Sequence, residues 1–577
     1  MRKMAKITSV ALSALLMAGS LSAFAACGGG AGGAGGGGGE SEKPDSKKTQ
    51  LYVRNYQGGF GNKWLYNGKA KLEEKYKNQS LEDGKTGVQV IIKDIKETPQ
   101  IANIQNDEHE VYFVEKVQYL YLEKQGVLED LTDIVTKANP YDNKTIESKL
   151  SKEQQEFYGV KDGTETKYYA LPHYMAPMGI VYDKDLFEEK GYYFVEGYEE
   201  MTVLDDKFAL KGDTLSAGPD GKSGTSDDGL PATYADFWDL CEYIYNDSLL
   251  PLNWGGMNGA SFYITALMIQ LQADYMGKTD YMKNFTMEGE LSELVKLDSE
   301  GKIVMGTNGL PETETVTLDP ATNNGYEPFR HISYYYALDF LKTMMDNVGK
   351  YAVAENMKTT SYDAFKAQSD YVSSRFSSKS KRQAMLIEGS WWENEATKYF
   401  ESNEIVYKDA AKKENCNYGW MPLPRANAEN VGEHNATMVN TISSLCFVKK
   451  GLPEMKKQLA FDFVQLMNSD ESLVDFTLTT NAFKDFNYDL TPAQVETLTP
   501  FGQNLYDCWK SYDIINPHNA NEQYYNTIYT TDSTRRYSIS TVNVFPANTF
   551  LTDNTMTVAK YFEQTYSYKR ENIKSWN

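Results

Sequence analysis

The fold is decided by three short apolar runs, Leu51-Tyr52-Val53, Val88-Gln89-Val90-Ile91-Ile92 and Val111-Tyr112-Phe113-Val114. β-Branched and aromatic side chains dominate these runs, which is typical of buried strands. Residues 62–78 carry apolar side chains at helical spacing, and another helical stretch after the third run closes near Gly126. The pattern therefore predicts strands that alternate with helices, which is the mark of an α/β protein with a parallel sheet covered on both faces.

The order of these elements also predicts where a ligand would bind. Parallel sheets bind ligands beyond the carboxyl ends of their strands, which here means the loops that start at Asn55 and Glu115. Later elements are mostly helical, with amphipathic stretches at 334–346 and 453–467. Residues 190–232 and 280–325 have the polar, turn-rich composition expected of insertions.

The N-terminus reads as an export signal. A basic start and an apolar run at residues 7–21 precede Ala25-Ala26-Cys27, so we expect residues 1–26 to be a signal peptide. The apolar run is too short for a permanent membrane-spanning helix. Phe24-Ala25-Ala26-Cys27-Gly28 resembles the bacterial lipobox, and this resemblance implies lipidation of Cys27. Residues 27–48 are rich in Gly and then polar, so they are expected to be a flexible linker with a mean reach of about 25 Å.

Composition and charge exclude several classes of function. The formal net charge is −22, which argues against binding to nucleic acid and against docking on anionic lipid by charge. No later segment has a continuous apolar run long enough to span a bilayer. The remaining cysteines form no CxxC pair and are expected to be buried small hydrophobic residues, although disulfides stay open: Cys241, Cys416, Cys446 and Cys508.

Four segments, in order, resemble a known family. They are Gly126-Val127-Leu128-Glu129-Asp130-Leu131; Tyr169-Ala170-Leu171-Pro172 with Gly179-Ile180-Val181-Tyr182-Asp183-Lys184-Asp185-Leu186-Phe187; Ala384-Met385-Leu386-Ile387-Glu388-Gly389-Ser390-Trp391; and Tyr418-Gly419-Trp420-Met421-Pro422-Leu423-Pro424. Together they resemble the carbohydrate-binding, maltose-binding-protein-like solute-binding lipoproteins of ABC importers.

The resemblance implies a two-lobed, periplasmic-binding-protein-like α/β fold with a ligand cleft between the lobes. Lobe 1 would take residues 49–173 and 437–480, and lobe 2 would take 178–425 and 481–577. It implies capture of an extracellular oligosaccharide, hinge closure around it, and delivery to the permease subunits of an ABC transporter. The protein would be a lipid-anchored monomer on the outer face of the cytoplasmic membrane, and not an enzyme.

Candidate ligand-binding residues combine aromatic rings with short polar side chains, because sugars offer apolar C–H faces and hydroxyl groups. The resemblance places Trp391 in the cleft as a stacking platform, whereas its neighbour Trp392 is expected in the core. Trp254 lies in a glycine-rich segment, where an exposed aromatic side chain is typical of function, and a core position is the alternative. The remaining candidates follow the predicted strands or the first crossing between the lobes, where turn, capping or hinge-packing roles are the alternatives: Asn55, Tyr56, Gln57, Glu115, His173 and Tyr174.

The segment from Gly218 to Gly229 resembles irregular calcium loops. Its tight glycine turns would aim carboxylates at one hard cation, and the predicted ligands of a structural calcium are Asp220, Asp227, Asp228 and Asp213. A solvated acidic turn is the alternative. The segment lacks both EF-hand spacing and the earlier glycine of a P-loop.

Two other classes of function remain open. A glycosidase needs two carboxylates that face one bond, and Glu388, Glu393 and Glu395 flank the tryptophans. Glu393 and Glu395 are two positions apart, however, so they diverge on a helix. A surface adhesin would use the same aromatic residues without a closing cleft. Within the binding-protein class, a peptide or another solute is the alternative ligand.

Overall fold

The computed structural model describes residues 42–95, 101–319, 324–520 and 545–572. The predicted signal peptide, Cys27 and most of the predicted linker lie outside these residues. Within the described part of the chain, no helix is both long and apolar enough to cross a membrane.

The first lobe is built on a five-stranded sheet with the order β2-β1-β3-β16-β6. Its strands are β1 Thr49–Tyr56, β2 Val88–Ile95, β3 Val111–Glu115, β6 Leu171–Pro172 and β16 Ser444–Val448. β1 pairs in parallel with β2 and β3, which confirms the predicted parallel arrangement, whereas β16 pairs antiparallel with β3 and β6. All five residues of β3 are buried, as expected for a central strand.

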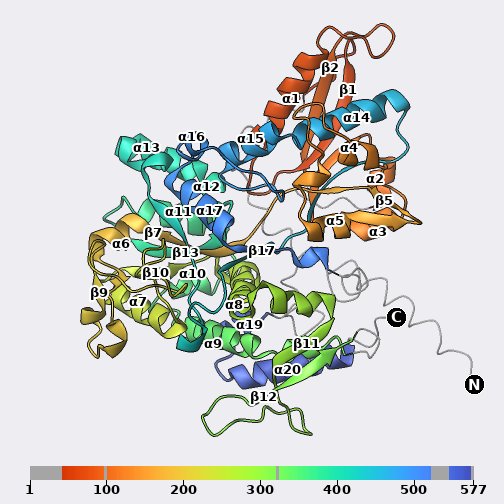
Figure 1. Ribbon diagram of the computed structural model, residues 1–577. Helices are drawn as coiled ribbons and strands as arrows, with labels where there is room; N and C mark the ends of the chain where they lie inside the picture. The colour runs from red at the N-terminus through yellow and green to blue at the C-terminus, as the bar shows by residue number, and fades with distance from the viewer. Residues whose placement is uncertain (1–41, 96–100, 320–323, 521–544, 573–577) are drawn as a thin grey trace, which may run out of the picture.

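Helices cover this sheet in the upper right of Figure 1. They are α1 Lys63–Tyr76, α2 Ile101–Asn106, α3 Tyr119–Lys124, α4 Thr132–Thr136, α5 Lys152–Tyr158, α14 Glu454–Met467 and α15 Asp470–Thr480, with the hairpin β4 Gly159–Asp162 and β5 Glu165–Tyr168 beside them. α1 buries Trp64, Leu65 and Leu72, as its spacing predicts. It approaches α14 so closely that a Cβ on Gly68 would lie 2.1 Å from the sulfur of Met467.

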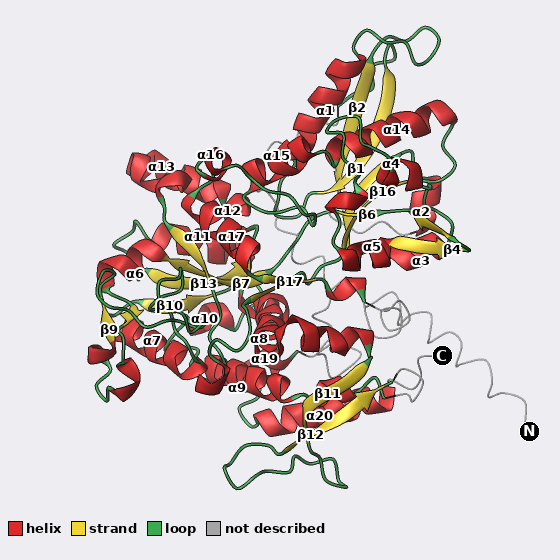
Figure 2. Cartoon of the chain, viewed as in Figure 1, coloured by secondary structure: helices red, strands yellow, loops and turns green. Residues whose placement is uncertain are grey.

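The second lobe contains a four-stranded sheet with the order β10-β13-β7-β14, of which β10, β13 and β7 are labelled in Figure 2. The strands are β7 Met178–Asp183, β10 Leu250–Asn253, β13 Gln383–Gly389 and β14 Tyr418–Met421. β10 and β13 are parallel, and β7 lies antiparallel between β13 and β14. Every residue of β7, β13 and β14 is buried, so three of the four segments that carry the family resemblance contribute fully buried strands.

Most of the helices belong to the second lobe. They are α6 Lys184–Lys190, α7 Tyr234–Asn246, α8 Gly256–Thr286, α9 Ile332–Asp346, α10 Ala354–Met357, α11 Ala364–Ser374, α12 Trp392–Glu395, α13 Thr397–Tyr407, α16 Pro492–Val495 and α17 Pro500–Ser511. α8 changes direction at Gly277, where φ is +67° and ψ is 162°. A side chain there would be strained, and its Cβ would also meet the ring of His434.

The intervals predicted as insertions contain two antiparallel pairs. β8 Tyr193–Phe194 pairs with β9 Phe208–Ala209, and β11 Gly289–Val295 pairs with β12 Thr313–Leu318. The C-terminal helices α19 Pro546–Thr552 and α20 Val558–Asn572 pack on α9, and α20 lies beside the β11–β12 hairpin at the bottom of Figure 1.

The two sheets are joined where the chain passes from β6 to β7 and from β14 to β16. β15 Thr437–Val439 pairs there with β17 Asp513–Ile515. Asn440, directly after β15, accepts a hydrogen bond from the backbone N–H of Ala176 (3.1 Å) and donates its own N–H to Ile515 (2.8 Å). This residue therefore holds three chain segments together between the lobes.

Lys484, which belongs to the range 481–577 predicted for lobe 2, is fully buried against Trp64 and Phe113 of lobe 1. The amphipathic stretch predicted at 453–467 forms α14, which begins at Glu454 with Pro453 as its N-cap. The expected burial of Cys241, Cys416, Cys446 and Cys508 is confirmed, and all four are free thiols.

Candidate functional site

The carboxyl ends of the lobe 1 strands bring three candidate residues to one edge of the sheet. Asn55 lies opposite Asp94 of β2, and its side-chain N–H donates to the Asp94 carboxylate at 2.8 Å. The carbonyl oxygen of the Asn55 side chain is buried and has no hydrogen-bond partner among the described residues. Tyr56 and Gln57 follow it and are half-buried. Asn55 thus offers a buried acceptor at the edge where the topology predicts a ligand.

Glu115 and Tyr174 form a buried pair at the same edge. The Tyr174 hydroxyl donates to Glu115 Oε2 at 2.5 Å, and Lys116 lies 3.2 Å from the other carboxylate oxygen. Burial, followed by the charge of Glu115, holds the pKa of Tyr174 well above its ordinary value, so this hydroxyl remains a donor. The ring of Phe60 packs on Tyr174 with a centroid separation of 4.3 Å.

Trp391 meets this edge from the other lobe. It lies two residues after the end of β13, and its indole lies between two glycines, one from each lobe. A Cβ on Gly59 of lobe 1 would lie 2.0 Å from Trp391 Cδ1, and a Cβ on Gly389 would lie 2.4 Å from the six-membered ring. Phe60 and Tyr263 complete the surroundings at centroid distances of 5.9 and 6.4 Å, so Trp391 is only 7% exposed.

A buried and a half-buried carboxylate, Glu388 and Glu395, share one hydrogen-bond donor. The side-chain amide of Gln368 donates to Glu395 at 2.7 Å and to Glu388 at 3.3 Å. Burial, and then the charge of Glu395, raises the pKa of Glu388 to about 8, and burial also raises the pKa of Glu395. Both shifts favour the protonated form, since the charge on one carboxylate disfavours charge on the other.

Glu393 faces a different set of partners. Its Oε2 accepts hydrogen bonds from Asn481 (2.8 Å) and Thr499 (2.6 Å), and burial raises its pKa to about 7. The divergence of Glu393 and Glu395 expected from their spacing is therefore observed. Trp392 is fully buried, as expected.

His173 and Trp254 are placed inside the lobes. The ring of His173 packs against Trp64, Phe113 and Tyr174, and its Nδ1 lies 2.7 Å from Lys484 Nζ. The expected exposure of Trp254 is wrong, because its side chain is fully buried. The glycines beside it serve close packing, since a Cβ on Gly255 would lie 2.7 Å from the backbone of Ala364.

The acidic loop at residues 218–229 is held by hydrogen bonds between its own residues. Asp228 accepts N–H bonds from Gly224 and Thr225, Asp227 accepts from Asp220 N–H and the Thr225 hydroxyl, and Asp220 accepts from Lys222 N–H. In the described part of the chain, no group of three or more His, Cys, Asp or Glu side chains is arranged to hold a metal ion, and this includes Asp213. The predicted structural calcium therefore stays a prediction, as does its alternative, a solvated acidic turn.

Several residues of the site were not anticipated from the sequence. Gly59 and Phe60 follow the first strand, and the run Gly58-Gly59-Phe60-Gly61 was the available signal for a close approach. Tyr263, Gln368 and Asn394 carry no such local signal, because they come from three different helices or helix starts. Two surface cavities, of about 540 and 360 Å³, are lined by other residues, the larger at the opposite ends of β10 and β13.

The fold and the site define a class of protein. Two α/β lobes joined by crossing strands, with polar and aromatic side chains meeting at strand ends from both lobes, are the architecture of solute-binding proteins. Residues 69–338 match the family profile of bacterial extracellular solute-binding proteins, and the family resemblance read from the sequence is thereby confirmed.

Solved structures show the same fold over nearly the whole chain. A chitin oligosaccharide binding protein (13% identity) and a solute-binding protein in complex with raffinose (14% identity) each align over 92% of this chain and 100% of their own, with TM-scores of 0.50. An ABC transporter binding protein from Bifidobacterium animalis subsp. lactis in complex with mannobiose has a TM-score of 0.52 at 12% identity, over 91% of this chain and 95% of its own. No curated protein sequence matches significantly.

Proposed function

We propose that the protein captures an extracellular oligosaccharide and delivers it to the permease of an ABC transporter by closing its two lobes around it. The observation that carries this proposal is the contact between Trp391 of lobe 2 and Phe60 of lobe 1. Phe60 also packs on Tyr174, whose hydroxyl donates to Glu115. Aromatic rings pack on the C–H faces of a sugar, and buried carboxylates accept hydrogen bonds from its hydroxyl groups.

The similar structures support the same class of ligand, since one is a chitin oligosaccharide binding protein and the other two are complexes with raffinose and mannobiose. In our proposal Trp391 stacks on a sugar ring. Asn55 and Glu115, which belong to lobe 1, accept hydrogen bonds from the sugar hydroxyl groups. Tyr56, Gln57 and Tyr174 line the same side. His173 and Trp254 support the walls from inside the lobes.

Closure would follow from differential binding. A ligand that contacts both lobes stabilises the conformation in which the lobes approach, and this shifts the population toward it. The proposed docking partner is the permease, which would recognise the closed form. The protein would act as a monomer held at the outer face of the membrane by lipidated Cys27.

The test is a thermal-shift screen of the purified protein against chitin oligosaccharides, raffinose, mannobiose and a peptide panel, followed by calorimetry. We expect one oligosaccharide class to raise the melting temperature, and Trp391→Ala to weaken its binding by about 10-fold or more. Trp238→Ala, a tryptophan of α7 in lobe 2, is the matched control. If only peptides raise the melting temperature, the ligand is a peptide and not an oligosaccharide. If cleaved glycan appears, the protein is a glycosidase.

A further inference from the structure

A loop of lobe 1 covers the indole on which the ligand is proposed to stack. Residues 57–61 follow β1, and Gly59 lies directly on the five-membered ring of Trp391, as the 2.0 Å separation of a hypothetical Cβ from Cδ1 shows. Phe60 packs edge-on to the same indole. Stacking needs an open ring face, and Trp391 at 7% exposure has none in this conformation.

A hydrogen bond between the lobes holds this loop in place. The side-chain N–H of Asn394, in α12 of lobe 2, donates to the backbone carbonyl of Gly59 at 2.9 Å. Asn394 Nδ2 also lies close to the next glycine, 3.5 Å from the position of a Cβ on Gly61, whose φ is +68°. The loop therefore reaches Asn394 and Trp391 together, and only glycine at position 59 allows both contacts.

We propose that loop 57–61 is a cover that lobe 1 places over Trp391, held by Asn394, and that the ligand must displace it. This inference rests on the proposed function, because it takes Trp391 as the stacking platform. Cover and ligand then compete for one ring face. The apparent affinity equals the intrinsic affinity reduced by the fraction of molecules in which the cover is open.

Asn394→Ala tests the cover without adding bulk. Loss of one inter-lobe hydrogen bond should raise the open fraction and tighten binding of the responsive oligosaccharide by roughly fivefold. Hydrogen-exchange mass spectrometry of the ligand-free protein should show faster exchange in peptides that contain residues 57–61. The matched control is Asn403→Ala, whose side chain donates hydrogen bonds to Ser373 and Tyr399 within lobe 2. It should change neither quantity.

Gly59→Ala provides a second, independent variant. The Cβ of the new alanine would collide with the Trp391 indole. Gly59→Ala should therefore accelerate hydrogen exchange of residues 57–61 in the wild-type background. In a Trp391→Ala background, where the ring is gone, Gly59→Ala should add nothing further.

The possible results separate the two proposals. If no probe binds the wild-type protein, the proposed function fails, while the exchange data still decide whether the cover exists. If Asn394→Ala leaves loop exchange unchanged, the cover does not exist. If Asn394→Ala speeds hydrogen exchange of residues 57–61 but weakens oligosaccharide binding, the loop forms a wall of the binding site. That result would overturn the proposal that the ligand displaces the loop.

Discussion

At the scale of single residues, the most unusual environment is that of Lys484. Its ammonium group is fully buried and contacts His173 Nδ1 and the rings of Trp64, Phe113 and Phe476, and among the described residues it forms no ion pair with a carboxylate. Burial lowers the pKa of Lys484 to about 7 and holds the pKa of His173 well below its ordinary value. The folded protein therefore prefers both groups neutral.

This preference predicts how stability depends on pH. Between about pH 7 and pH 10 the unfolded chain keeps Lys484 protonated while the folded protein does not, so the unfolded state binds more protons. The contribution of Lys484 to the free energy of unfolding should therefore rise with pH in this window, by at most about 1.4 kcal/mol per pH unit. Lys484→Met should remove this slope.

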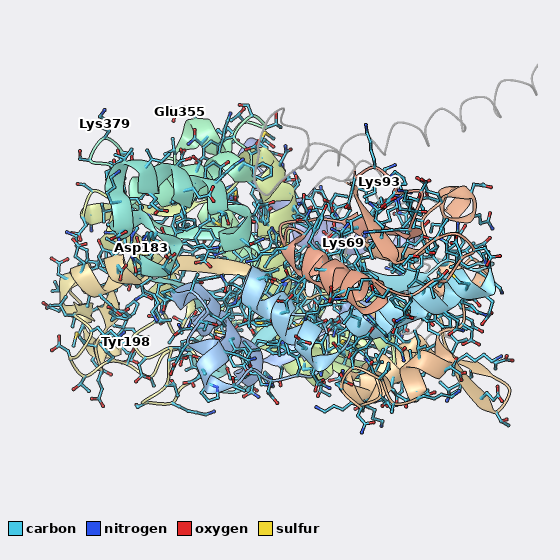
Figure 3. All side chains as sticks on the ribbon, turned by 90° about the horizontal axis from the view of Figure 1, so that it is seen from above. Lys69, Lys93, Asp183, Tyr198, Glu355 and Lys379 are labelled. Carbon is cyan, nitrogen blue, oxygen red and sulfur yellow. The ribbon has the colours of Figure 1, made fainter. Side chains whose placement is uncertain are left out.

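The measurement is urea unfolding from pH 7 to pH 10 for the wild type, Lys484→Met and a control. Lys379→Met is the control, because the Lys379 side chain is exposed and points away from the molecule (Figure 3). Equal slopes in all three proteins would contradict a depressed pKa for Lys484.

At the scale of elements, the turn from β7 into α6 is held by one buried carboxylate. Asp183 caps α6 through Leu186 N–H and forms ion pairs with Arg375 and Arg382, each at 2.6 Å, with its side chain only 2% exposed (Figure 3). Asp183→Ala leaves two guanidinium groups without this partner and removes the cap. We expect a loss of about 3–5 kcal/mol in the free energy of unfolding.

Chemical denaturation checks this loss. Asp162→Ala is the control, since Asp162 pairs with Lys167 on an exposed hairpin, and such pairs contribute little. If Asp183→Ala were as mild as Asp162→Ala, the buried ion pairs would not stabilise the β7–α6 turn.

The acidic loop at 218–229 gives a prediction about calcium. Its carboxylates already accept hydrogen bonds from the backbone and from Thr225, so removing divalent cations should not loosen it. The melting temperature should be the same in EDTA and in millimolar calcium. A fall in EDTA would instead support the calcium site predicted from the sequence, and Asp228→Ala would then have to abolish that difference.

The elements also show how far the sequence alone reaches. β1, α1, β2 and β3 were predictable because each is a local pattern, and their parallel pairing follows from the alternation of strands and helices. Local patterns could not predict contacts between residues hundreds of positions apart. Such contacts are the antiparallel pairing of β16, the contact of Lys484 with His173 and the contact of Gly59 with Trp391. Trp254 was misjudged for a related reason, since its glycines accommodate residues 356–364, a distant segment.

At the scale of the whole molecule, the candidate site exists only where the two lobes meet. Trp391 and Asn394 belong to one lobe, and Gly59, Phe60 and Glu115 belong to the other. A salt bridge between Glu153 of α5 and Lys278 of α8 (3.1 Å) adds a second contact between the lobes. Under the proposed function, ligand affinity and lobe position would therefore be coupled through the same surfaces, as closure requires.

The predicted lipid anchor adds a test for the intact molecule. A diacylglycerol on Cys27 would keep the folded part near the permease, with a linker reach of about 25 Å. Cys27→Ala should move the protein from the membrane fraction to the soluble exported fraction, as immunoblotting of cell fractions would show. Calorimetry on the purified variant should give the same oligosaccharide affinity as wild type, because residue 27 precedes both lobes. Retention of Cys27→Ala in the membrane would contradict anchoring through this residue, whereas altered affinity would mean that the N-terminal segment takes part in binding.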